Sequence, residues 1–213
     1  MNTVFTDIRQ HSIVEPASLT SGVVFALPHS GRDYGVSFLN QSILNRRSIR
    51  SSEDAFLDKL IDGIEKYGAP TIIANAPRAF IDLNRSTDEL DPALISGIKN
   101  SIRNPRVSSG LGVIPRVVAH GKEIYRGKLS FEQAQSRIAY YWKPYHKDLS
   151  DLLKRAQSIY GQSLLIDLHS MPHEAVSTQS SFIKAPEIVV GDRFGMSSDP
   201  EFTNLIISIL KQH

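Results

Sequence analysis

Two kinds of hydrophobic pattern alternate along the chain. Short continuous apolar runs, which are typical of buried strands, occur at Val23–Leu27, at Thr71–Ala74 and at residues 163–168. Two weaker runs, at residues 80–83 and 187–190, predict two further strands.

Between these runs, apolar residues recur every three or four positions, which predicts helices. One such stretch covers residues 54–67, and a second begins at Ser130, is interrupted by Pro144 and ends at Gly161. A last helix is predicted over residues 204–211. Strands that alternate with helices indicate an α/β fold, here a single domain with a mostly parallel or mixed sheet flanked by helices.

Composition is that of an ordinary globular protein. The 213 residues are 41% hydrophobic and 22% charged, which is enough to bury a substantial core. No window approaches the roughly 18 consecutive apolar residues of a membrane-spanning helix. The first residues do not form a secretory signal, so we expect a cytoplasmic protein.

Charge and cysteine content narrow the possible chemistry. The net charge is +2, and the one basic cluster, Arg46, Arg47 and Arg50, predicts a solvated loop rather than a nucleic-acid surface. The chain has no cysteine, which excludes disulfides and thiolate metal sites. Catalysis must therefore rely on histidines, carboxylates or hydroxyls.

Two histidines follow predicted strands. His29 lies two residues beyond the run that ends at Leu27, and His169 follows the run that ends at Leu168. Ligands of open α/β sheets bind outside the carboxyl ends of the strands, so both imidazoles are candidate metal ligands. A catalytic zinc site adds a third protein ligand, for which Asp54, with Glu53 beside it, is the best candidate. Asp54 in the Ser-x-x-Asp pattern is equally well explained as a helix cap.

A third group of polar residues surrounds the apolar run at residues 80–83. Arg78 precedes this run, and Asn84 and Arg85 follow it. Arginine binds carboxylates with two parallel hydrogen bonds, so this group predicts a site for an acidic small molecule. The alternative is that Arg85 pairs on the surface with an acidic neighbour, namely Asp82, Asp88 or Glu89.

Seven motifs together resemble one known family. In order they are PHSG, EDAFLDKL, RAFIDLNR, GLGVIPR, KPYHKDL, LLIDLHSMP and VVGDRFG, and they extend from about Pro28 to Gly195. The chain is similar in these motifs to the N-formylglutamate amidohydrolases. The resemblance implies a zinc carboxypeptidase-like fold, related to aspartoacylases and succinylglutamate desuccinylases. It also implies zinc-dependent hydrolysis of a small acidic N-acyl amino acid, N-formyl-L-glutamate, to formate and glutamate in histidine degradation.

The resemblance also implies roles for individual residues. His29 and His169 match the zinc histidines, and Asp54 matches an acidic position that we assign as the third ligand. The related zinc enzymes use a His-x-x-Glu pair instead, and Arg32 stands at the position of that glutamate. The third ligand therefore stays open between Asp54 and Glu53.

For the substrate, the resemblance implies that Arg78 polarises the scissile carbonyl. It implies further that Asn84 and Arg85 hold the substrate carboxylate. His146 either lines the pocket or packs as a structural residue.

The general base has no clear candidate in the sequence. Family members continue beyond the GDRFG motif with a glycine-rich stretch and a Gln-x-Glu strand, whereas this chain ends at His213. We therefore expect residues 1–213 to form a single domain that lacks the family's C-terminal part. The base is then in that part, or it is Glu174 or Glu187. The alternatives are a shortened, weakly active member that binds metal and ligand, or a related zinc amidase or carboxypeptidase with another N-acyl substrate.

Overall fold

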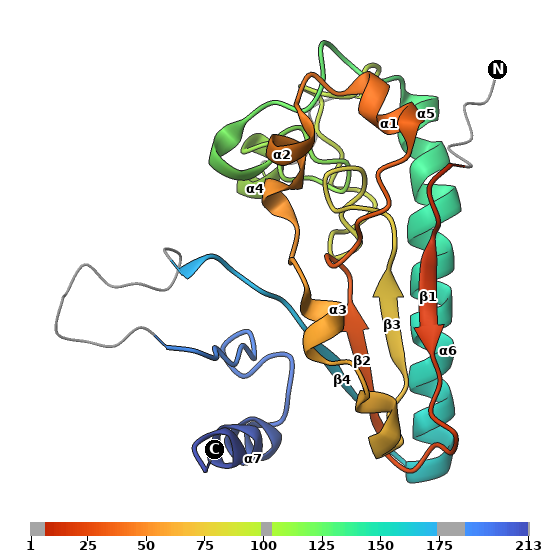
Figure 1. Ribbon diagram of the computed structural model, residues 1–213, viewed down its shortest axis with the longest axis vertical. Helices are drawn as coiled ribbons and strands as arrows, with labels where there is room; N and C mark the ends of the chain where they lie inside the picture. The colour runs from red at the N-terminus through yellow and green to blue at the C-terminus, as the bar shows by residue number, and fades with distance from the viewer. Residues whose placement is uncertain (1–6, 99–103, 174–185, 213) are drawn as a thin grey trace, which may run out of the picture. The chain divides into compact units, whose positions relative to one another are not determined.

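The computed structural model describes residues 7–98, 104–173 and 186–212 (Figure 1). The chain divides into two compact units, Met1–Ser170 and Met171–His213. Each unit is described by itself below.

The first unit is built around a four-stranded mixed sheet. Its strands are β1 (His11–Val14), β2 (Val23–Leu27), β3 (Thr71–Ala74) and β4 (Leu164–Asp167), in the order β1-β3-β2-β4. β2 is parallel to both β3 and β4, and β1 joins β3 antiparallel. The predicted mixed α/β sheet is confirmed, although β1 did not stand out in the hydrophobic pattern.

A long helical column runs alongside this sheet, next to β1 (Figure 1). It consists of α5 (Phe131–Arg137), a π-helical turn η4 (Ile138–Trp142) and α6 (Lys143–Tyr160). Pro144 does not interrupt the column, because it falls in the first turn of α6, where the missing N–H is tolerated. Gly161 ends α6 with a φ of 75°, as its position in the sequence predicts.

The helix predicted over residues 54–67 is wrong in its extent. The chain instead forms two short turns, α3 (Leu57–Leu60) and η2 (Ile64–Tyr67). Gly63 separates them with a φ of 90°, a left-handed conformation that interrupts the helical hydrogen bonds. The remaining helical segments of this unit are equally short, namely α1 (Val36–Gln41), α2 (Arg46–Ile49), η1 (Arg50–Ser52), α4 (Pro105–Ser108) and η3 (Ala119–Gly121).

The strand predicted at residues 80–83 is also wrong. This segment is irregular, yet its apolar side chains Phe80, Ile81 and Leu83 are buried. Arg137 of α5, itself fully buried, donates from Nη1 to the Phe80 carbonyl at 3.0 Å and lies over the Phe80 ring. Core packing and side-chain hydrogen bonds, rather than a strand ladder, therefore hold this segment.

The second unit contains one described helix, α7 (Pro200–Leu210). It begins four residues before the predicted start, with Asp199 as the N-cap that accepts from the Glu201 N–H at 2.9 Å. Residues 187–190, predicted as a strand, are irregular and exposed. Across both units, no helix in the described residues is long and apolar enough to span a membrane.

Candidate metal centre

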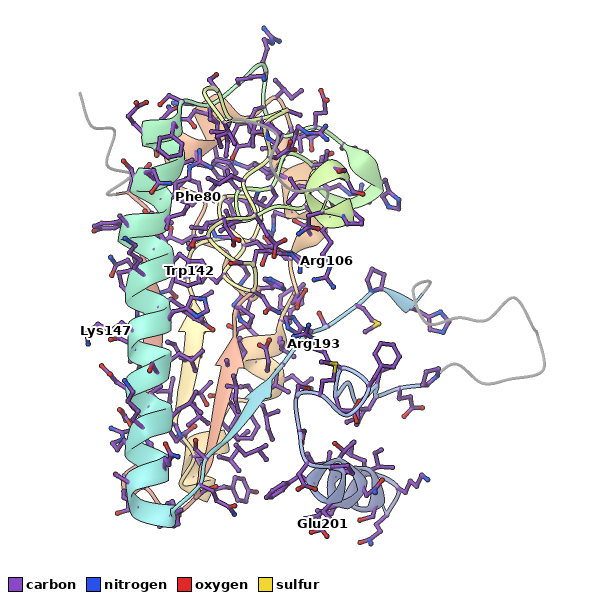
Figure 2. All side chains as sticks on the ribbon, turned by 180° about the vertical axis from the view of Figure 1, so that it is seen from behind. Phe80, Arg106, Trp142, Lys147, Arg193 and Glu201 are labelled. Atoms are coloured by element: carbon purple, nitrogen blue, oxygen red, sulfur yellow. The ribbon has the colours of Figure 1, made fainter. Side chains whose placement is uncertain are left out.

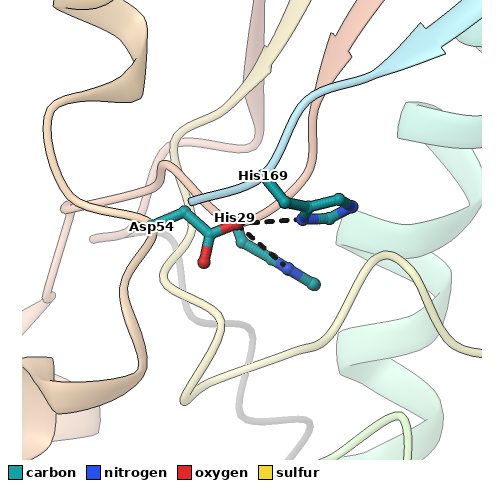
Figure 3. Close-up of side chains that lie close together, drawn as sticks. All are labelled: His29, Asp54 and His169. Atoms are coloured by element: carbon teal, nitrogen blue, oxygen red, sulfur yellow. Dashed lines mark hydrogen bonds and ion pairs between the residues drawn. The ribbon is translucent and has the colours of Figure 1, made fainter. Parts of the chain in front are cut away.

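Three potential metal ligands converge at one edge of the sheet (Figure 3). His29 follows β2, His169 follows β4, and Asp54 follows the η1 turn. Because β2 and β4 are parallel neighbours, their carboxyl ends bring the two imidazoles together. One ligand atom from each of the three residues lies within 4.8 Å of the others. Asp54 Oδ2 is 2.9 Å from His169 Nδ1 and 3.7 Å from His29 Nδ1.

Asp54, and not Glu53, faces this centre. Its backbone N–H donates to the His29 carbonyl at 3.1 Å, and Oδ2 accepts the Ser170 N–H at 3.2 Å. Glu53 instead accepts two hydrogen bonds from Arg50, at 3.0 and 3.1 Å. The helix-cap alternative for Asp54 is wrong, because Phe56 occupies the N-cap of α3 and no side chain caps that turn.

A carboxylate supports each imidazole on the side away from the centre. His29 Nε2 donates to Asp82 Oδ1 at 2.7 Å, and His169 Nε2 donates to Asp167 Oδ2 at 3.0 Å. Such partners fix the orientation and tautomer of metal-binding histidines. The Nδ1 atom of His29 is buried and makes no hydrogen bond, so it presents a lone pair toward Asp54. Two nitrogens and one carboxylate oxygen match the donor set of a catalytic zinc site.

The site favours a cation. Burial alone would raise the pKa of Asp54, but the hydrogen bond from His169 and the nearby imidazole of His29 outweigh it and hold that pKa far below its usual range. Burial also raises the pKa of Asp82, but the contacts with His29 and Arg78 outweigh it and lower that pKa to about 2. Hydrogen bonds to Asp167 and Asp54 raise the pKa of His169 to about 9. The carboxylates are therefore ionised at neutral pH, and they stabilise positive charge between them.

Asp82 connects the centre to the polar residues around it. Oδ1 accepts the Asn84 N–H at 2.9 Å, and Oδ2 accepts from Arg78 Nε at 3.0 Å. Arg85 Nε lies 3.8 Å from the same Oδ2. The alternative that paired Arg85 with Asp82 is therefore correct in the partner, although Asp82 is buried and not at the surface. The Asn84 side chain reaches the centre itself, with Nδ2 at 3.2 Å from both Asp167 Oδ2 and His169 Nε2.

The sequence model of the N-formylglutamate amidohydrolase family matches residues 21–213. The chain belongs to this family. Among curated relatives, the N-formylglutamate deformylases of Pseudomonas aeruginosa and Pseudomonas putida are each 26% identical over 180 residues, or 84% of this chain. The matched regions span 62% and 61% of those relatives, less than two thirds of their length.

Solved structures agree with this assignment. A crystal structure of the N-formylglutamate amidohydrolase from Ralstonia eutropha is 28% identical, with a TM-score of 0.82 over 95% of this chain and 73% of that one. A gene product from Agrobacterium tumefaciens is 13% identical, with a TM-score of 0.56 over 80% of this chain and 60% of that one. The second likeness shows the fold alone.

His146 makes contacts away from the three metal-ligand candidates. Its Nε2 lies 2.8 Å from the Leu83 carbonyl, and its ring stacks on Trp142 with centroids 3.8 Å apart. Burial lowers the pKa of His146, which keeps the ring neutral at pH 7. Its contact with substrate stays a prediction.

Three residues at or near the candidate site were missed by sequence reasoning. Asp82 was considered only as a surface partner of Arg85, and Asp167 and Trp142 were not considered. The signal for the two carboxylates is their place two residues from a candidate site residue, in the DLNR and DLHS motifs. Of the candidate bases, Glu174 lies outside the described residues, and Glu187 belongs to the second unit.

Proposed function

We propose that this chain hydrolyses the N-formyl amide of N-formyl-L-glutamate. Water adds to the formyl carbon, the C–N bond breaks, and formate and glutamate leave. The proposal is supported by membership of the family and by relatives named N-formylglutamate deformylases. The observation that carries it is the convergence of His29, Asp54 and His169, with a carboxylate behind each imidazole.

A metal fits this group of residues, and we propose zinc. His29 Nδ1, Asp54 Oδ2 and His169 Nδ1 would hold it, which leaves a fourth position of a tetrahedral site open. When bound, zinc acts as a Lewis acid that polarises a carbonyl and acidifies water. The buried Nδ1 of His29 has no hydrogen-bond partner, and this supports the assignment, because a buried polar atom without a partner lowers the stability of the fold.

The remaining roles fall to polar groups around Asp82. Arg85 and Asn84 bind the carboxylate of the acidic N-acyl amino acid, since a guanidinium and an amide give a directional, charge-assisted contact. Arg78 stabilises the oxyanion that develops on the formyl oxygen. Asp82 holds Arg78 through a hydrogen bond of 3.0 Å, so that this guanidinium is fixed before substrate binds. As part of the proposal, the reaction belongs to histidine degradation in the cytoplasm.

Formate release from N-formylglutamate tests the proposal. The protein is stripped with a chelator and reloaded with zinc, and we expect one zinc per chain and turnover only in the loaded form. Unchanged turnover after complete removal of metal would overturn the assignment of the centre.

A substrate panel tests the specificity. N-formyl-, N-acetyl- and N-succinylglutamate and N-formylaspartate are compared by kcat/KM, because discrimination is a difference in transition-state binding. We expect the highest value for N-formylglutamate. A higher value for another compound would favour a related N-acyl amidase, and zinc and glutamate binding without formate release would indicate a binding protein.

A further inference from the structure

The backbone of residues 83–85 is held by side chains rather than by secondary structure. The Leu83 carbonyl is 2.8 Å from His146 Nε2, and the Arg85 carbonyl accepts a hydrogen bond from Trp142 Nε1 at 2.8 Å. Between them, the Asn84 N–H donates to Asp82 Oδ1 at 2.9 Å. Three consecutive residues are thus fixed, and two of the three contacts come from the helical column.

Trp142 and His146 act as one rigid pair. They are four residues apart, so they share a face of the column, and their rings stack with an angle of 29° between the planes. Tyr145 packs edge-on against His146, with ring centroids 5.4 Å apart. Figure 2 shows Trp142 on the column. The two donors are therefore held by ring packing, independently of the loop they contact.

The π-helical turn sets the direction of this pair. Trp142 is the last residue of the turn Ile138–Trp142, which holds one more residue per hydrogen-bonded ring than an α-helix. An extra residue rotates the following face by about 100°, because an α-helix has 3.6 residues per turn. The helix face that carries Trp142 and His146 is therefore rotated about the column axis relative to the buried face of α5, which carries Ala134 and Arg137.

We propose that Trp142 and His146 are positioning residues for the substrate site, an inference that rests on the proposed function. By fixing the carbonyls on both sides of Asn84, they fix where its amide stands relative to His169 and Asp167. Asn84 Nδ2 donates to Asp167 Oδ2 at 3.2 Å and lies 3.2 Å from His169 Nε2, so a small backbone shift moves it out of hydrogen-bond range of Asp167. The hydrogen bonds of the pair go to the loop and not to the three metal-ligand candidates, so the pair acts through the loop.

Variants that keep the stack and remove a donor test this proposal. Trp142→Phe and His146→Phe retain an aromatic ring but lose the N–H. The matched control is Tyr160→Phe, because Tyr160 also donates to a backbone carbonyl, that of Leu19 at 2.9 Å, from the far end of α6. Each protein is loaded with zinc, and zinc content, Tm, KM, kcat and the Kd of glutamate are measured.

We expect both site variants to raise KM and the glutamate Kd by roughly 2- to 10-fold, as the loss of one hydrogen bond allows. Their zinc content stays at one per chain, and Tyr160→Phe keeps the wild-type KM. His146→Gln, which offers an amide N–H, recovers much of the affinity that His146→Phe loses.

Two outcomes contradict the proposal, and a third separates it from the proposed function. Site variants that lower Tm as the control does, with unchanged KM and glutamate Kd, would show a purely structural role. A wild-type protein that binds neither N-formylglutamate nor glutamate overturns both proposals. A wild-type protein that binds glutamate but releases no formate overturns only the proposed function, since the glutamate Kd then still reports on Trp142 and His146.

Discussion

Glu53 and Asp54 are adjacent carboxylates with different partners, which provides a matched pair of variants. Asp54→Ala leaves two histidines for the metal, and we expect zinc affinity to fall by more than the ~10–100-fold typical of losing an outer partner. Glu53→Ala removes contacts with Arg50 and Tyr34 and none with the three metal-ligand candidates, so we expect its zinc content to stay at the wild-type level. Zinc is measured by elemental analysis after dialysis against a weak chelator. Equal zinc in both variants would rule Asp54 out as a ligand.

Arg85 is the residue on which the proposed recognition of an acidic ligand depends. Its side chain is only 15% exposed, and Nε has no hydrogen-bond partner. We expect Arg85→Ala to weaken glutamate binding by ~1.5–3 kcal/mol, or roughly 10- to 100-fold, as measured by calorimetry. Arg155→Ala, which breaks an exposed pair with Glu15, is the control and leaves the Kd unchanged. If both variants bind alike, the guanidinium of Arg85 is not a substrate contact.

His146 makes stability depend on pH. Burial lowers its pKa in the folded chain, whereas the unfolded chain titrates near the ordinary value of about 6.5. Below that pH the unfolded state binds a proton that the folded state resists, so stability is lost as the pH falls. We expect the Tm difference between the wild type and His146→Gln to narrow between pH 8 and pH 5.5. A difference that is constant over this range would contradict the neutral, buried ring.

The metal-ligand candidates could be predicted because each is tied to a local pattern. His169 directly follows an apolar run, His29 lies two residues beyond another, and neighbouring parallel strands end at the same edge of a sheet. Asp82, Asp167 and Trp142 were missed because their roles depend on which imidazole or carbonyl the folded chain brings to them. No spacing in the sequence reports that a tryptophan on a helix faces the Arg85 carbonyl.

At the scale of elements, the helical column depends on how it begins. Ser130 Oγ accepts the Gln133 N–H at 3.2 Å, and Gln133 Oε1 accepts the Ser130 N–H at 2.9 Å. We expect Ser130→Ala to lower the free energy of unfolding by about 1 kcal/mol, because the Gln133 N–H loses its acceptor at the start of the helix. Ser158→Ala, an exposed position of α6, is the control and stays near wild type in denaturant titrations. A larger loss at Ser158 would contradict this account of the cap.

Strands that correspond to continuous apolar runs were predicted well, whereas segments whose conformation depends on one residue or on tertiary contacts were not. β2, β3 and β4 are continuous apolar runs, and all three are strands. The pattern over residues 54–67 has helical spacing, but it contains Gly63, whose left-handed φ divides it. Residues 80–83 look like a strand because all are buried, although the buried Arg137 and aromatic rings surround them instead of neighbouring strands. The spacing of apolar residues shows which side chains are buried, but it does not show whether strands, helices or single side chains cover them.

At the scale of the whole molecule, burial is distributed unevenly along the chain. Of the described residues, every buried one lies between Ile8 and Ala156, and the three metal-ligand candidates precede Met171. We expect a chain that ends at Ser170 to fold and to bind zinc with unchanged stoichiometry. Its Tm should differ by less than about 4 °C, the change that ~1 kcal/mol produces in a domain of this size. Thermal melts with and without zinc check this, and a collapse of the melting transition would show that the second unit contributes to the core.

The position of β4 beside β2 has a consequence for the nascent chain. The ribosome releases the N-terminus first, so His29 and Asp54 emerge early, and the whole helical column follows before β4 and His169 appear. Until then β2 has an open edge and the centre lacks one imidazole. Docking of β4 then covers this edge of β2 and brings the second imidazole to the centre. The nascent polypeptide therefore carries His29 and Asp54 without His169 until β4 has been synthesised, and we expect a cation to bind at this centre only after that strand has docked.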